Sequence, residues 1–154
     1  MVNIRSAAES AVKAYSAAIA LGGNYSYPLP KLASHVSTFF MPNYTSYSLG
    51  EINLSPNQSV VASDFESIYS EWRSNGQPGT VIQIVHHKIQ PVSNSSAICW
   101  LTYHIDPQNG QPEWEWTNVY GFRQTEEKFT NGLYGGWEFA VEDNEHSQYA
   151  SHSH

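Results

Sequence analysis

Two residues on one expected strand could carry out acid–base chemistry. His104 and Asp106 stand two residues apart in the run SAICWLTYHID (96–106), and alternate residues of a strand point to the same face. A nearby carboxylate fixes the tautomer of an imidazole and raises its basicity, so such a histidine can act as a general base. Because Asp106 precedes Pro107 and can simply begin a turn, we predict His104 as the base and leave Asp106 without a role.

A carboxylate follows an aromatic strand near the end of the chain. In GWEFAVEDNE (136–145), Trp137, Phe139 and Val141 alternate with polar residues, and the same alternation reaches Asp143. A carboxylate among rings loses hydration, which raises its pKa and suits a general acid near neutral pH. Alternatively, the strand ends early and Asp143, with the residues after it, caps the sheet edge in solvent.

Neutral polar groups stand between large rings in WEWTNVYGFRQT (114–125). Asn118 and Tyr120 alternate with Trp116 and Phe122 on one expected face. A buried amide or phenol needs a hydrogen-bond partner, which an oxygen of a ligand could supply. The alternative is an aromatic core in which Tyr120 reaches water only at the rim.

The adjacent pair His86-His87 provides another candidate base. On a regular strand the two rings point to opposite faces, so one of them faces inward whichever register holds; we predict His86 as the second choice. No HExxH spacing accompanies the histidines, and Cys99 is the single cysteine. We therefore expect no bound metal and interpret Cys99 as a buried, inert thiol.

Further side chains are expected at the mouth and walls of a cavity. Tyr44 and Tyr47 lie on a short strand, His35 lies on the second expected helix, and Trp100 shares its face with His104. Each of them could equally be packing or surface. The full set predicted to contact a substrate is Trp116, Phe122, Trp100, Tyr47, Tyr44, His35 and Phe139.

The charge balance restricts the partners. The 154-residue chain has 14 Asp+Glu against 7 Lys+Arg, a formal net charge of -7. Phosphate backbones and anionic membranes repel such a chain, so we expect neither nucleic acid nor membrane as a partner. The length suits one domain, which we place at residues 1–146, before a flexible tail at 147–154. With no apolar leader at its start, the chain is expected in the cytoplasm.

The elements that must position these residues change type at about Thr80. Helical spacing runs from Ile4 to Ile19, over PLPKLASHVSTFF (28–40), and from Ser63 to Asn75-Gly76, with capping boxes expected at Ser6/Glu9 and Ser63/Glu66. A short strand is expected at 44–52, and alternation predicts four long strands at 80–90, 96–106, 114–125 and 136–145. Helices segregated from an antiparallel sheet define an α+β fold.

Both faces of two expected strands are largely apolar. Around Trp100 and around Val119, large side chains occur on both alternating faces, whereas an antiparallel sheet usually leaves one face to water. We therefore expect the helices to cover one face and a second copy of the chain to cover the other, as a homodimer.

The element order, the run WTNVYGFRQT and the closing GGWEFAVEDNE resemble the NTF2-like superfamily, in particular its SnoaL-like members from fungal secondary metabolism. The resemblance implies a cone, in which a strongly curved sheet wraps around three N-terminal helices and leaves a pocket at its open end. A more distant similarity to the scytalone dehydratases would match Asn118 to a pocket asparagine. Trp116 replaces the serine of that family, and its two catalytic histidines have no clean match.

The resemblance also implies a function. Its members isomerise, dehydrate or cyclise small molecules, usually without a metal or cofactor, and so we expect an enzyme acting on a hydrophobic, oxygenated polyketide or terpenoid intermediate. His104 or His86 would take a proton, Asp143 would give one, and Asn118 with Tyr120 would hold the developing oxyanion. The alternative is a non-catalytic binding or dimerisation module. Epoxide hydrolysis ranks last, because Arg123 falls on the face opposite Asn118.

Overall fold

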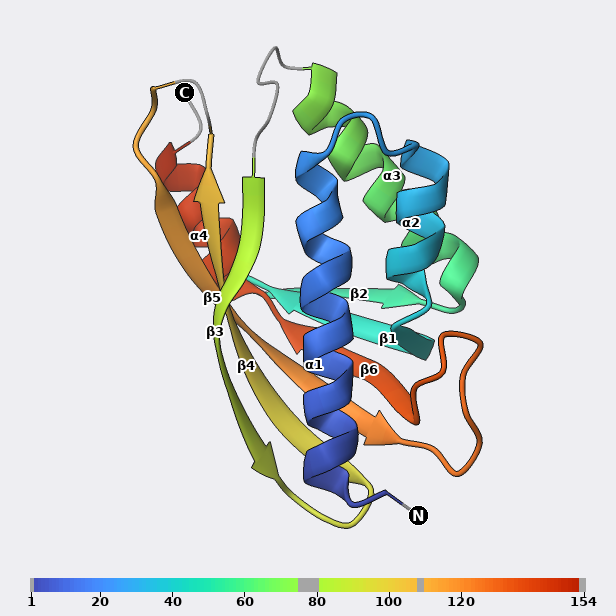
Figure 1. Ribbon diagram of the computed structural model, residues 1–154. Helices are drawn as coiled ribbons and strands as arrows, with labels where there is room; N and C mark the ends of the chain where they lie inside the picture. Colours follow the sequence, from blue (N-terminus) through green and yellow to red (C-terminus); the bar gives the residue numbers. More distant parts are fainter. Residues whose placement is uncertain (1, 75–80, 108–109, 153–154) are drawn as a thin grey trace.

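A computed structural model describes residues 2–74, 81–107 and 110–152 of the chain (Figure 1). Helices α1 (Ile4–Ala20), α2 (Leu29–Ser37) and α3 (Gln58–Ser74) are joined by a 3₁₀ turn after α1 and by strands β1 (Phe40–Ser48) and β2 (Glu51–Ser55). Strands β3 (Val81–Pro91), β4 (Ser96–Asp106), β5 (Trp114–Gln124) and β6 (Gly135–Val141) follow, and α4 (Asp143–His152) ends the order. None of the described helices is long and apolar enough to cross a membrane.

The helices begin at other caps than the sequence suggests. Asn3, not Ser6, caps α1, because its side chain accepts a hydrogen bond from the Ser6 backbone N–H at 2.8 Å. Asn57 does the same for α3, accepting from the Val60 N–H at 3.1 Å, so that helix starts five residues before Ser63. Both caps are asparagine side chains that satisfy free N–H groups of the first turn. The expected end of α3 at Asn75-Gly76 and the strand start at Thr80 lie outside the described residues.

The six strands form one sheet in the order β2-β1-β6-β5-β4-β3. All neighbours are antiparallel except β1 and β6, which pair in parallel. The sheet curves around α1, while α2 and α3 lie on the same side of it (Figure 1). This is the predicted α+β cone.

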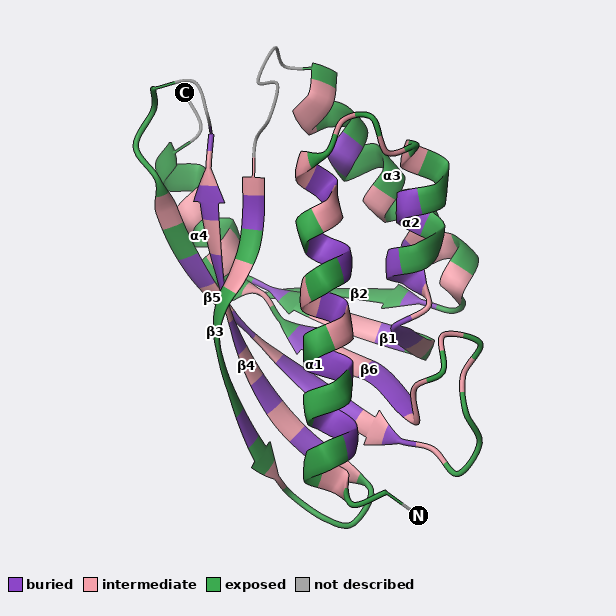
Figure 2. Cartoon of the chain, in the orientation of Figure 1, coloured by how far each residue is buried: buried purple, intermediate pink, exposed green. Residues whose placement is uncertain are grey.

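One face of the curved sheet packs on the helices and will be called the inner face. On β4 the residues alternate strictly, with Cys99, Leu101 and Tyr103 buried and their neighbours half exposed. Figure 2 shows this alternation as purple and pink bands along the strand. The inner residues of β5 are Trp116, Asn118, Tyr120 and Phe122, as predicted.

Strand β6 does not alternate regularly. Trp137 pairs with Phe122 on the inner face, but Phe139 pairs with Gly121 on the outer face, because an extra residue bulges out at Glu138. After this bulge the order of faces is reversed: Ala140 pairs with inner Tyr120 and is completely buried. The reversal turns the next residue of that parity, Glu142, toward the inside.

The chain after β6 forms a helix, not a strand end and a flexible tail. Residues 143–152 form α4, which corrects the expectation for all of the tail except residues 153 and 154, outside the described part. Tyr149 holds the helix in place, since its ring stacks on Trp72 of α3 and contacts Trp114 of β5 edge-on. Helix α4 thereby lies over the end of β5 and faces α3 across the open end of the cone.

The outer face of the sheet keeps a band of exposed apolar side chains. It includes Tyr47, Ile52, Leu54 and Val141, with exposed fractions of 41%, 69%, 60% and 38%; registers Tyr47↔Ile52 and Tyr47↔Val141 place three of them side by side. Contiguous exposed apolar side chains of this kind are typical of a surface that binds another protein chain.

Candidate active site

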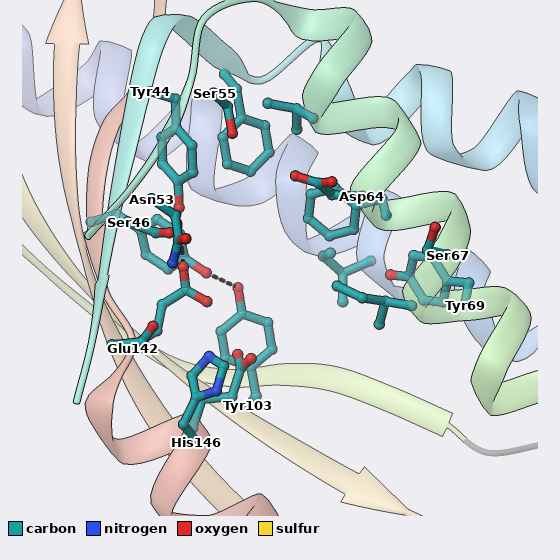
Figure 3. Close-up of a pocket in the computed structure, with 18 of the residues that line it drawn as sticks. Tyr44, Ser46, Asn53, Ser55, Asp64, Ser67, Tyr69, Tyr103, Glu142 and His146 are labelled. Carbon is teal, nitrogen blue, oxygen red and sulfur yellow. Dashed lines mark hydrogen bonds between the residues drawn. The ribbon is translucent and has the colours of Figure 1, made fainter. Parts of the chain in front are cut away.

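The open end of the cone is hollow. A cavity of about 480 Å³ lies between the inner face of the sheet, α3 and α4, within the size range of small-molecule sites. Figure 3 shows Tyr44, Glu142 and His146 on one wall and Asp64, Ser67 and Tyr69 of α3 on the opposite wall. The lining also includes Tyr15, Phe40, Ser46, Ser48, Asn53, Ser55, Phe65, Trp72, Tyr103, Trp116, Tyr120, Glu145 and Tyr149.

A cluster of tyrosine hydroxyls lies in the inner part of this cavity. The hydroxyl oxygens of Tyr103 and Tyr120 are 2.5 Å apart, and the Tyr120 oxygen accepts from Asn118 Nδ2 at 3.4 Å. Burial and then repulsion from neighbouring phenols raise the pKa of Tyr15, Tyr103 and Tyr120, and the charges of Glu142 and Glu145 add to the rise at Tyr120. These phenols therefore stay protonated and serve as hydrogen-bond donors.

Glu142 is a carboxyl group poised to titrate near neutrality. Burial, and then repulsion from Glu145, raise the pKa of Glu142 to about 7. The charge of His146 and a hydrogen bond from the Tyr44 hydroxyl oppose the rise; that hydroxyl donates to Glu142 Oε1 at 3.3 Å. At pH 7 the group is thus divided between its acid and base forms, which is the state that suits proton transfer.

Glu145 is the second carboxylate and is held more firmly. It accepts a hydrogen bond from Asn118 Nδ2 at 2.9 Å. Burial raises the pKa of Glu145, while the Asn118 amide and the Trp116 indole lower it. The Trp116 ring is itself stacked on Tyr103, with centroids 5.1 Å apart. Sheet and helix together therefore fix this carboxylate in position.

The sequence Glu142-x-x-Glu145-His146 brings three polar groups together at the start of α4. Residues three and four apart meet on one helix face, and ligand atoms of the three side chains lie within 4.8 Å of one another. Two carboxylates this close either share a proton or take up a cation. These are also the side chains that would supply ligands if the site held a metal ion.

Four of the residues predicted from sequence do lie at this site. Tyr44, Trp116 and Tyr120 line the cavity, and Asn118, 1% exposed, bonds to Glu145 directly behind it. Phe122 lies on the same inner face but beyond the cavity, packed edge-on against Trp137. The catalytic and binding roles assigned to these residues stay predictions.

Other predicted site residues lie on the outer face of the sheet. His104 is on the half-exposed face of β4, where its Nε2 is 3.6 Å from Glu113 Oε1. Trp100 shares that face, and His86 pairs there with Thr102. Tyr47 and Phe139 follow the same outer register on β1 and β6. The residues of β4 alternate between two faces, as predicted. Which of these faces turns inward depends on the packing of the helices.

Asp143 and His35 are also outside the cavity. Asp143 is exposed because the bulge in β6 turns Glu142, not Asp143, toward the inner face. Its carboxylate accepts a hydrogen bond from the Leu49 backbone N–H at 2.8 Å. His35 is an exposed residue of α2 whose ring lies edge-on to Phe39. Neither side chain lines the cavity.

The sequence contained a signal for the missed pair. Asp143 and Asn144 are residues favoured at helix starts, so EDNEH could have been taken as a helix beginning with glutamates three apart. Asn144 in fact accepts from the Thr117 N–H of β5 at 2.6 Å and ties the helix start to the sheet.

No protein-family model matches the chain, and no curated protein matches it. Among solved structures it is similar to an NTF2-like protein with a cystatin-like fold from Novosphingobium aromaticivorans, at 11% identity and a TM-score of 0.60, over 89% of this chain and 79% of that one. It is also similar to a candidate ketosteroid isomerase from Shewanella frigidimarina, at 16% identity and a TM-score of 0.56, over 88% and 93% of the two chains.

A third similar structure is a candidate scytalone dehydratase from Novosphingobium aromaticivorans, with 11% identity and a TM-score of 0.57, over 89% of this chain and 80% of that one. At such identities the likeness establishes the fold and leaves the chemistry to the site. The protein has the α+β cone fold of these structures.

Proposed function

We propose that this protein is a small acid–base enzyme that moves a proton on a hydrophobic, oxygenated molecule bound in the cone. The observation that carries the proposal is Glu142, a carboxyl group with a pKa of about 7 on the wall of a cavity of about 480 Å³. In this proposal the protein is an isomerase, dehydratase or cyclase of the SnoaL-like type that acts on a polyketide or terpenoid intermediate without a cofactor.

The chemistry follows from the positions of the groups. Ionised Glu142 takes a proton from a carbon next to a substrate carbonyl, and the electron pair of the C–H bond moves to the carbonyl oxygen as an enolate. A phenol of the Tyr103–Tyr120 pair donates a hydrogen bond to that oxygen. Protonated Glu142 then returns the proton to another carbon, which isomerises the substrate, or to a leaving hydroxyl, which dehydrates it.

Glu145 and Tyr44 act as positioning residues in this scheme. Tyr44 orients the Glu142 carboxyl by a hydrogen bond at 3.3 Å. Glu145, fixed by Asn118, keeps the pKa of Glu142 raised by its negative charge. Without that charge Glu142 would be a weaker base.

Deuterium exchange tests the proposal without knowledge of the natural substrate. We would incubate a panel of aromatic and alicyclic ketones with the protein in D₂O and follow loss of the proton next to the carbonyl by NMR. Wild-type protein is expected to accelerate exchange of at least one ketone, and Glu142→Gln to reduce it by about 10²-fold or more. Asp143→Asn, one residue away and outside the cavity, is the matched control. Equal exchange by wild type and Glu142→Gln would contradict the proposal.

A non-catalytic binding module is the second candidate, favoured by the largely apolar walls of the cavity. It predicts ligand binding without any exchange. For either function we also propose that a second copy of the chain covers the outer face, supported by the exposed apolar band of Tyr47, Ile52, Leu54 and Val141.

A further inference from the structure

We propose that the cavity selects a positively charged organic ligand, a protonated or quaternary amine, and rejects anions. The inference rests on the site proposed above and names the class of molecule it takes, namely one that carries a cationic nitrogen as well as oxygen. It is carried by the distribution of charges and rings around the cavity.

The first step is an excess of negative groups. The partly buried Glu142 and Glu145 line the cavity, and so do the exposed residues Glu51 and Asp64. His146 is the one basic side chain among the described lining residues. A recess walled by low-dielectric material concentrates the field of such groups, so the cavity attracts cations.

The second step concerns the seven lysines and arginines. All seven are described residues, and none of them lines the cavity. Arg123 pairs with Glu138 on the outer face, and Arg73 donates to the Tyr27 and Asn24 carbonyls outside the cavity. Arg5 donates to the Ile89 carbonyl. Lys31, Lys88 and Lys128 lie over the rings of Tyr27, Trp100 and Tyr134, and Lys13 is an exposed residue of α1. Among the described residues no lysine or arginine lines the cavity, so His146 is the basic side chain beside Glu142 and Glu145.

The third step is the nature of the walls. Aromatic rings surround the carboxylates on the sheet, on α3 and on α4, among them Tyr44, Tyr69, Trp72, Trp116 and Tyr149. Rings exclude water and attract an ammonium group through their faces. A carboxylate together with aromatic walls is therefore complementary to an alkylammonium group, and the same set repels a carboxylate or phosphate.

The fourth step gives the two carboxylates different tasks. Asn118 holds Glu145 in place by a hydrogen bond at 2.9 Å, so Glu145 is the positionally fixed carboxylate that faces the ammonium group. Glu142 lies beside it and remains free to exchange a proton. Ser46, Ser48, Asn53 and Ser55 line the β1–β2 side and offer hydrogen bonds to hydroxyl or carbonyl oxygens of the same ligand.

Three phenols that differ in the charge of the substituent at position 3 test the inference. They are the cation (3-hydroxyphenyl)trimethylammonium, its uncharged carbon isostere 3-tert-butylphenol, and the anion 3-hydroxybenzoate. Each would be titrated into the protein at pH 8, where Glu142 is largely ionised, and followed by NMR. We expect the cation to bind at least about tenfold more tightly than the neutral isostere and the anion not to bind.

Variants assign the selectivity to the cavity. Glu145→Gln should bring the cation-to-neutral ratio close to one while the neutral isostere still binds, which shows an intact cavity. Asp143→Asn removes the same charge from outside the cavity and should leave the ratio unchanged. A ratio near one in wild type, or unaltered selectivity in Glu145→Gln, would overturn the inference. Tight binding of Zn²⁺ alone that displaces the organic cation would also overturn it, in favour of a metal site.

The outcome separates this inference from the proposed function. Cation selectivity without deuterium exchange would contradict the proposed enzyme and support the cationic ligand class. Exchange on neutral ketones without cation selectivity would support the enzyme and contradict the cationic ligand class.

Discussion

Asn118 of β5 donates a hydrogen bond from Nδ2 to Glu145 Oε1 of α4 at 2.9 Å. This bond joins the sheet to a helix that the sequence analysis did not expect, and it fixes one of the two partly buried carboxylates. The position of α4, and with it one wall of the cavity, depends on this contact and on the packing of Tyr149 against Trp72 and Trp114.

The first prediction concerns this bond. Asn118→Ala removes a donor from a buried carboxylate, so the pKa of Glu145 should rise further and the free energy of unfolding should fall by about 1–3 kcal/mol. Urea unfolding and a carboxyl ¹³C titration measure the two effects. Asn144→Ala, which removes an exposed bond between the same two elements, should leave the pKa of Glu145 in place; a shift of equal size in both variants would speak against a specific contact.

The second prediction is that stability falls as the pH rises through neutrality. The pKa of Glu142 is raised from 4.5 to about 7 in the folded protein, so between these values the folded state binds more protons than the unfolded state. Its contribution is complete below pH 4.5 and is lost as the pH passes 7, a change of about 3 kcal/mol. Urea unfolding at several pH values should show this slope, reduced in Glu142→Gln. A stability that rises from pH 5 to 8 in wild type would contradict the assignment.

The third prediction concerns the paired phenols. Tyr103→Phe and Tyr120→Phe each remove one hydroxyl of a bond of 2.5 Å, leaving a buried hydroxyl with fewer partners, and each should cost about 1–2 kcal/mol. The double variant should cost less than the sum, because the second change removes a group already deprived of its partner. Full additivity in chemical denaturation would show that the two hydroxyls do not interact.

The fourth prediction tests the bulge in β6. A Cβ added at Gly121 would lie 2.1 Å from the Phe139 ring, so Gly121→Ala should lower stability by about 1–3 kcal/mol through overpacking. In a Phe139→Ala background the same substitution should cost little. If the cost persists there, Phe139 does not cover Gly121 and the register after the bulge is different.

The fifth prediction concerns a second copy on the outer face. Ile52→Lys combined with Leu54→Lys places two charges in the exposed apolar band and should convert a dimer to monomer in sedimentation velocity. Val92→Lys changes a residue that is equally exposed, at 64%, but lies beyond β3, and should leave the mass unchanged. A monomeric wild-type protein would refute the dimer directly.

Local sequence patterns indicated three of the helices and the long strands, and on β4 and β5 they indicated which side chains share a face. Amphipathic spacing located the three helices, and alternation located the long strands, because both periods record which residues avoid water. The inner set of Trp116, Asn118, Tyr120 and Phe122 followed from one such period on β5. An α+β fold could therefore be expected from these periods, whereas the cone was implied by the resemblance to the NTF2-like superfamily and the parallel pairing of β1 with β6 was not expected.

The acid–base residues were decided by tertiary structure. Alternation alone cannot tell which face of β4 will meet the helices, so His104 and Trp100 were assigned inward when they lie outward. A single bulged residue in β6 exchanges inside and outside beyond it, which replaces Asp143 by Glu142. The sequence by itself thus indicated three helices, the long strands, the inner residues of β5 and the acidic balance. Only the assembled fold, through one shifted register in β6 and the docking of α4, placed Glu142 and Glu145 beside the cavity, because tertiary packing decides which side chains lose contact with water.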